Sequence, residues 1–255
     1  MVVFRDDVFG TKKAWLNEFS EKYTKEIGLP YFCYTHPGTV DSEIASLLKS
    51  SGCVFTTMGV QSADDTVRRE ILNRKYTNEQ VIESVSVLKK NGIRVSLDQI
   101  VGLPGETKKQ LIDAAELYVN LRPDRLLTFW LECFPGTGIM RIARERGLLS
   151  AEDEDAIRRG HAGYRYSGGT LGAGSSLAGI VNFLNAIPLI PRNIAASMIK
   201  KGYAERFPSS SLLQIFLMVA NAIFIRDPFF FYNIRFMFSK KRIFSQGGTN
   251  AALEK

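Results

Sequence analysis

Residues 98–107 read DQIVGLPGET, and this stretch carries the fold prediction. Its first half ends an apolar, β-branched run, and its second half places two glycines and a proline ahead of a helical pattern. That order is typical of a buried strand, a tight turn and a helix. A strand that is apolar at consecutive positions is buried on both faces, as strands of parallel sheets are. The stretch therefore predicts a parallel α/β fold whose turn backbone approaches a bound ligand closely.

The same alternation recurs through the first 150 residues, at intervals of about thirty residues, which is the size of a βαβ unit. Helix starts are predicted at Thr77 with Gln80, which form a capping-box pattern, at Asp41, and at Ser62 with Asp65. The fold class is therefore α/β with five parallel βα units. The expected strands are residues 2–4, 31–35, 54–58, 93–100 and 126–131.

The pattern changes near residue 150, where we predict a domain boundary. Residues 1–150 form the βα domain, residues 151–176 a linker rich in small residues, and residues 177–255 a mostly helical extension that is apolar and ends in a basic cluster. Helices are expected over 177–190 and 211–225, followed by an aromatic run over 229–238. Two interpretations of the extension stay open: helices that cover the βα domain, or contact with a membrane interface.

Composition limits the class of protein. With 255 residues, 45% hydrophobic and 23% charged, the chain can bury a full core. The net charge of +7 is modest, and the basic residues are scattered until Lys240, so nucleic-acid binding is unsupported. Three widely spaced cysteines and an amino terminus without an export pattern favour the cytoplasm.

Polar residues directly after the predicted strands are the candidate ligand-binding residues, because ligands of parallel α/β folds sit at the carboxyl ends of strands. They are Asp6, Asp7, His36, Gly59, Gln61, Ser62, Asp98 and Glu132. Simpler interpretations exist for several: Asp6 and Asp7 as a helix cap, Gln61 with Ser62 as a helix entry, and His36 as a turn residue. Asp98 is different, because burying an unpaired carboxylate in an apolar run costs several kcal/mol.

Four ordered motifs carry a family resemblance. They are VVFRDDVFG (2–10), MGVQSADDTVRREILNR (58–74), DQIVGLPGET (98–107) and FPGTGI (134–139). Together they resemble the radical SAM superfamily, and within it the branch that carries a cobalamin-binding domain ahead of the radical SAM domain. The resemblance implies a partial (β/α)6 radical SAM barrel over residues 2–149 that binds S-adenosylmethionine (SAM).

The resemblance also implies roles for individual residues. Asp6 and Asp7 would lie near the SAM amino group, Gln61 and Arg74 would contact its ribose and carboxylate, and Asp98 would bind the ribose. Gly59, Ile100 and Val101 would supply backbone or apolar contacts to the adenosine. The resemblance does not indicate which residue is catalytic.

The chain departs from the family at the cluster-binding motif. Members hold a [4Fe–4S] cluster through Cys-x3-Cys-x2-Cys after the first strand, whereas Cys33, Cys53 and Cys133 lie far apart. We interpret all three as buried apolar residues and expect no metal ligands. The sequence begins at what resembles the second strand, which suggests a truncated chain, a displaced start codon or a missing companion chain.

Three functions follow as hypotheses, and whether this chain is itself an enzyme stays open. The first is the SAM-binding domain of a radical SAM enzyme that methylates or rearranges an unactivated carbon with cobalamin. The second is a non-catalytic SAM-binding fragment without its iron–sulfur cluster, and the third is a radical SAM enzyme that modifies RNA. For the first, a small-molecule or lipid-like substrate is expected.

Overall fold

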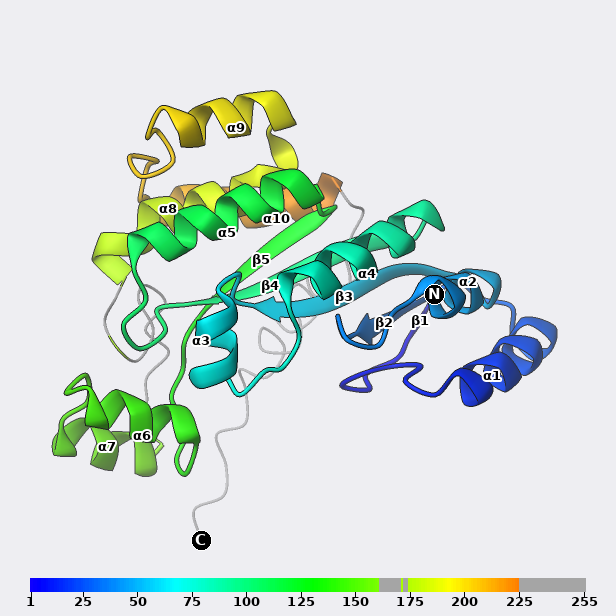
Figure 1. Ribbon diagram of the computed structural model, residues 1–255, viewed down its shortest axis with the longest axis horizontal. Coiled ribbons are helices and arrows are strands. Elements are labelled where there is room, and N and C mark those ends of the chain that lie inside the picture. Colours follow the sequence, from blue (N-terminus) through cyan, green and yellow to red (C-terminus); the bar gives the residue numbers. More distant parts are fainter. Residues whose placement is uncertain (161–170, 172–173, 225–255) are drawn as a thin grey trace, which may run out of the picture.

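The computed structural model describes residues 1–160, 171 and 174–224. Within them one parallel sheet runs in chain order β1-β2-β3-β4-β5. Its strands are β1 (Val2–Val3), β2 (Tyr31–Thr35), β3 (Cys53–Gln61), β4 (Arg94–Val101) and β5 (Arg125–Trp130). The predicted parallel α/β class is confirmed, and the sheet curls into a half-barrel (Figure 1).

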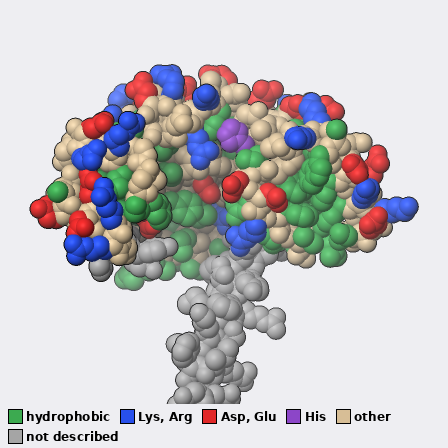
Figure 2. Space-filling model, turned by 90° about the horizontal axis from the view of Figure 1, so that it is seen from below, with side chains coloured by type: hydrophobic (Ala, Val, Ile, Leu, Met, Phe, Trp, Pro, Cys, Tyr) green, Lys and Arg blue, Asp and Glu red, His purple; other side chains and the backbone are tan. Residues whose placement is uncertain are grey.

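Helices cover the outer face of this sheet. They are α1 (Lys13–Glu26), α2 (Ser42–Ser50), α4 (Asn78–Lys90) and α5 (Lys108–Leu121), with the short α3 (Asp65–Glu70) after β3. Right-handed crossovers between sequential parallel strands place the connecting helices on one side, so these helices do not cover the inner face. Figure 2 shows this face as a hollow lined by hydrophobic side chains, with charged side chains at its rim.

Alternation along β4 shows how the two faces differ. Val95, Leu97 and Val101 are fully buried in the core beneath the helices. Ser96, Asp98 and Ile100 have the opposite parity and face the hollow. Because both faces of β4 are largely buried, its sequence is a nearly continuous apolar run. The sequence alone therefore does not indicate which residues face the helices and which face the hollow.

The remaining helices extend the domain beyond β5. They are α6 (Gly138–Glu145), α7 (Ala151–Arg158), α8 (Gly174–Ala186), the 3-10 turn η1 (Ile187–Leu189), α9 (Arg192–Lys200) and α10 (Ser211–Phe224). Leu177, Phe183 and Leu184 of α8 join the main core. The side-chain amide of Asn185 also donates to Thr128 Oγ1 of β5 at 2.8 Å. The start of the predicted extension is therefore continuous with the βα core.

Several local predictions need correction. The range 151–176, predicted to be a linker, contains α7, because Ser150 and Asp153 form a capping box ahead of it. Helix α3 is capped by Asp64, whose carboxylate accepts from the N–H groups of Thr66 and Val67, and not by Ser62. Strand β3 also runs on to Gln61, beyond the predicted end at residue 58. Most of the small-residue segment and the aromatic run 229–238 lie outside the described residues.

Candidate functional site

Two polar oxygens on the inner face lack hydrogen-bond partners. The register pairs Thr57 with Ser96 and Gly59 with Asp98, so Thr57 and Asp98 are diagonal neighbours on the same face of the sheet. Asp98 Oδ1 and Thr57 Oγ1 are both buried and accept or donate no hydrogen bond. Buried polar atoms are nearly always paired in native proteins. This pair is therefore the strongest structural sign of a ligand site.

Burial raises the pKa of Asp98 to about 7, and the positive charge of Arg125 opposes that rise. Arg125 is itself buried on the inner face, donating from Nε to Ser96 Oγ at 3.0 Å and lying 5.3 Å from the Phe55 ring centroid. A ligand that brings an N–H or O–H donor to Asp98 Oδ1 would stabilise the ionised carboxylate.

A strained turn places Gln61 at the rim of the inner face. The N–H of Ser62 donates to the carbonyl of Val60 at 2.7 Å, and Gln61 between them has φ of +62°. This is a γ-turn with positive φ, the rarer and more strained form. A Cβ on residue 59 would overlap Gln61 Nε2, so the glycine leaves room for the Gln61 amide to fold back over it. Gly59 pairs with Asp98 on the neighbouring strand. Strain of this kind concentrates at functional sites.

Two buried residues hold this turn. The hydroxyl of Tyr76 lies 2.9 Å from the carbonyl oxygen of Gly59 and 2.8 Å from that of Val60. Arg68 is fully buried, donates to the carbonyl of Ser62 and lies over the Tyr76 ring. Sequence reasoning missed both. The available signal was a charged residue on the apolar face of a short helix, next to Val67.

Tyr76→Phe is expected to lower the free energy of unfolding by about 1–2 kcal/mol, because two buried carbonyls lose their shared donor. Urea denaturation would measure it. Tyr203→Phe is the matched control, since Tyr203 is 53% exposed and its loss of a hydroxyl should change stability little. Equal stability of the two variants would contradict the assigned role of Tyr76.

The loop of the DQIVGLPGET stretch is closed by its own glutamate. Glu106 N–H donates to the carbonyl of Leu103 at 2.9 Å across Pro104 and Gly105, whose φ is +76°, as a type II turn requires. The Glu106 carboxylate accepts from the N–H of Gly102 at 2.6 Å. Burial raises the pKa of Glu106 to about 7, while hydrogen bonds from Gly102 and Leu103 oppose the rise. The loop thus ties down its own backbone beside the end of β4.

The structure brings together some of the predicted site residues. Gly59, Asp98 and Ile100 share the inner face, as the strand register requires. Gln61 pairs with Gln99 after a shift in register, and its side-chain amide folds back over Gly59. Val101 does not join them, because its side chain is fully buried beneath the helices and only its backbone is at the strand end.

The other predicted residues lie apart. Asp6 and Asp7 are exposed after β1, with β2 and β3 between them and Asp98. Arg74 is exposed in the loop before α4. The pKa of His36, just after β2, is lowered mainly by burial and also by the positive charge of Arg74. His36 Nδ1 accepts from the N–H of Gly38 at 3.0 Å, which is the turn role of the simpler interpretation. Glu132 lies just beyond the end of β5, and Ser62 lies just beyond the end of β3.

The cysteines of the described chain do not fit an iron–sulfur cluster. Cys33 and Cys53 are buried in the main core with their sulfurs 3.8 Å apart, and Cys133 is buried in a separate small core. The hydrogen bond with Cys53, together with burial, holds the pKa of the Cys33 thiol well above its ordinary value. No group of three or more His, Cys, Asp or Glu side chains suited to a metal occurs among the residues described.

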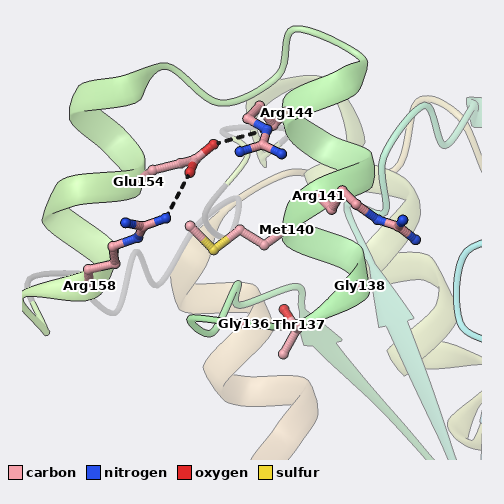
Figure 3. A pocket seen from close by; sticks show the side chains of 8 residues that line it. All are labelled: Gly136, Thr137, Gly138, Met140, Arg141, Arg144, Glu154 and Arg158. Carbon is pink, nitrogen blue, oxygen red and sulfur yellow. Dashed lines mark ion pairs between the residues drawn. The ribbon is translucent and has the colours of Figure 1, made fainter.

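A cavity of about 370 Å³ lies between α6 and α7. In it Glu154 lies between Arg144 and Arg158, with N–O distances of 3.6 and 3.7 Å, while Arg141 points away from α7 (Figure 3). Within the described ranges none of its lining residues has a buried side-chain polar atom without a partner. The inner face is therefore the better candidate site.

The curled parallel sheet forms a β/α half-barrel, and the unpaired polar atoms on its inner face make that face the candidate ligand site. Residues 12–118 match the model of the Radical SAM superfamily. This segment of the chain belongs to that superfamily.

Curated relatives include a tRNA-2-methylthio-N(6)-dimethylallyladenosine synthase of Acidithiobacillus ferrooxidans, 30% identical over 151 residues, or 57% of this chain and 33% of the relative. A ribosomal protein methylthiotransferase, RimO, of Clostridium botulinum is 25% identical over 157 residues, covering 59% and 32%. The chain thus spans about a third of their length.

Two solved structures are also similar. The radical SAM methyltransferase TsrM of Kitasatospora setae, with cobalamin and a [4Fe–4S] cluster bound, aligns with a TM-score of 0.47 and 23% identity over 52% of this chain and 26% of that one. Coproporphyrinogen III oxidase HemN of Escherichia coli, a radical SAM enzyme, aligns with a TM-score of 0.47 and 20% identity over 59% and 36%.

Proposed function

We propose that the inner face binds SAM and that this chain is the SAM-binding part of a cytoplasmic radical SAM enzyme that methylates or rearranges an unactivated carbon with the help of cobalamin. The observation that carries SAM binding is the pair of unpartnered buried oxygens, Asp98 Oδ1 and Thr57 Oγ1, inside the segment that matches the superfamily. A carboxylate and a hydroxyl are suited to the hydroxyls and amine of an adenosyl amino acid.

The protein's own residues would bind and orient this ligand. SAM, when bound, supplies an activated methyl group and an adenosyl carbon on its sulfonium. Asp98 would accept hydrogen bonds from the ribose, and Gln61 would offer its amide from the strained turn above Gly59. Leu127 and Ile100 would exclude water from the adenosine. No residue of the inner face is assigned to the iron–sulfur cluster or to cobalamin.

Two alternative functions have their own support. A SAM-binding module without redox chemistry is favoured by the described cysteines, which do not fit a cluster. RNA modification is favoured by the similarity to the tRNA-2-methylthio-N(6)-dimethylallyladenosine synthase. RNA binding that weakens steeply with salt would support the second alternative.

Calorimetric titration of the chain with SAM tests the proposal. Wild type is expected to bind, and Asp98→Ala to bind about tenfold more weakly, a loss of about 1.4 kcal/mol. Asp113→Ala is the matched control, because Asp113 is exposed on α5 and pairs only with the exposed Lys109 at 2.7 Å. Absence of SAM binding, or equal affinity of the two variants, would remove the assignment.

A further inference from the structure

Helix α10 presents an apolar face to solvent. It packs on α8 and β5, where Leu217, Asn221 and Ala222 are buried. Asn221 fixes the helix by donating from Nδ2 to the carbonyl of Asn185 at 2.7 Å. The remaining large side chains point outward: Leu212 is 78% exposed, Ile215 57%, Phe216 64%, Met218 58%, Ile223 54% and Phe224 70%.

These side chains form a stripe, since positions 212, 215, 216 and 223 share one helical face. A helix at a water-exposed surface normally turns charged residues outward, yet α10 contains no Asp, Glu, Lys or Arg. The described chain has no helix that is both long and apolar enough to cross a bilayer. The fourteen residues of α10 fit a helix that lies along a membrane surface instead.

The sequence after α10 supplies the matching charge. Residues 226–242 contain five Lys or Arg, one Asp and six Phe or Tyr. A sequence of basic and aromatic residues that follows an apolar helix is typical of segments that bind anionic lipid surfaces.

We propose that the exposed face of α10 docks on an anionic lipid bilayer. The helix lies in the headgroup region with Ile215 and Phe216 inserted. This surface lies outside the inner face of the sheet, so the docking does not depend on SAM binding.

Vesicle flotation of the full chain tests the docking. Wild type is expected to float with phosphatidylcholine vesicles that contain about a third phosphatidylglycerol, and to bind pure phosphatidylcholine vesicles more weakly. Phe216→Asp should reduce the bound fraction at limiting lipid by about tenfold, because one buried aromatic side chain is lost from the interface. Ile194→Asp is the matched control, since Ile194 is 49% exposed on α9, and it should bind as wild type does.

Three results would overturn the proposal. The first is wild type that stays unbound, and the second is Phe216→Asp that binds as tightly as Ile194→Asp. The third is an apolar face that is already covered without lipid, seen as a dimer that Phe216→Asp dissociates, or as amide-exchange protection of α10 in the monomer that Phe216→Asp removes. Far-UV circular dichroism of each variant establishes that it is folded.

Discussion

Arg68→Met is expected to lower the free energy of unfolding by about 3–5 kcal/mol, a large fraction of a typical domain's stability. Arg68 is fully buried and donates to the carbonyl of Ser62, to Asn78 Oδ1 at 2.9 Å, and to Asp65. A methionine fills similar volume but leaves the buried carbonyl of Ser62 and the partly buried Asn78 Oδ1 without this donor. The loss therefore exceeds that of an ordinary surface ion pair.

Arg69→Met is the control for that substitution. The neighbouring Arg69 is 64% exposed and pairs only with the exposed Glu70 at 3.4 Å, so its loss should change stability by less than about 0.5 kcal/mol. Urea denaturation of both variants gives the comparison. If Arg68→Met were as stable as Arg69→Met, the buried network would contribute little, and Tyr76 would have to hold the Gln61 turn alone.

The sheet was predictable because its determinants are local. Apolar runs separated by capped helices indicate parallel βα units whatever the final packing, and the capping box of Thr77 and Gln80 forms as its sequence predicts. Helix α7 was missed for a different reason. Its charged residues face solvent, so the apolar periodicity that marks a helix is weak, although Ser150 and Asp153 signal its start.

The site was only partly predictable, because it depends on register and backbone conformation. Ile100 and Val101 are equivalent in an apolar run, yet the pairing of Ile100 with Phe129 turns one to the hollow and the other to the core. The positive φ of Gln61 depends on contacts of its turn with Tyr76 and Arg68, which the local sequence of the turn does not encode. The reach of Glu106 back to Gly102 depends on the backbone conformation of the turn at Pro104 and Gly105.

Asp98→Asn is expected to remove the pH dependence that the carboxyl imposes on stability. Because the pKa of Asp98 is raised from 3.8 to about 7, the folded protein binds more protons than the unfolded chain between these values. The free energy of unfolding therefore falls as pH rises through that window. At about pH 8 the asparagine variant should be more stable than wild type by about 2–4 kcal/mol, and at about pH 3, below both pKa values, the difference should nearly vanish.

The measurement is a set of urea denaturations across this pH range, with Asp113→Asn as the control. Asp113 is 52% exposed in its side chain, so its variant should show no such window. A stability difference between Asp98→Asn and wild type that stays constant with pH would mean that burial does not raise the pKa of Asp98. If the pH dependence is present without SAM and disappears with SAM, then the ligand donates a hydrogen bond to Asp98 Oδ1. Such a bond stabilises the ionised carboxylate and returns its pKa toward the ordinary value.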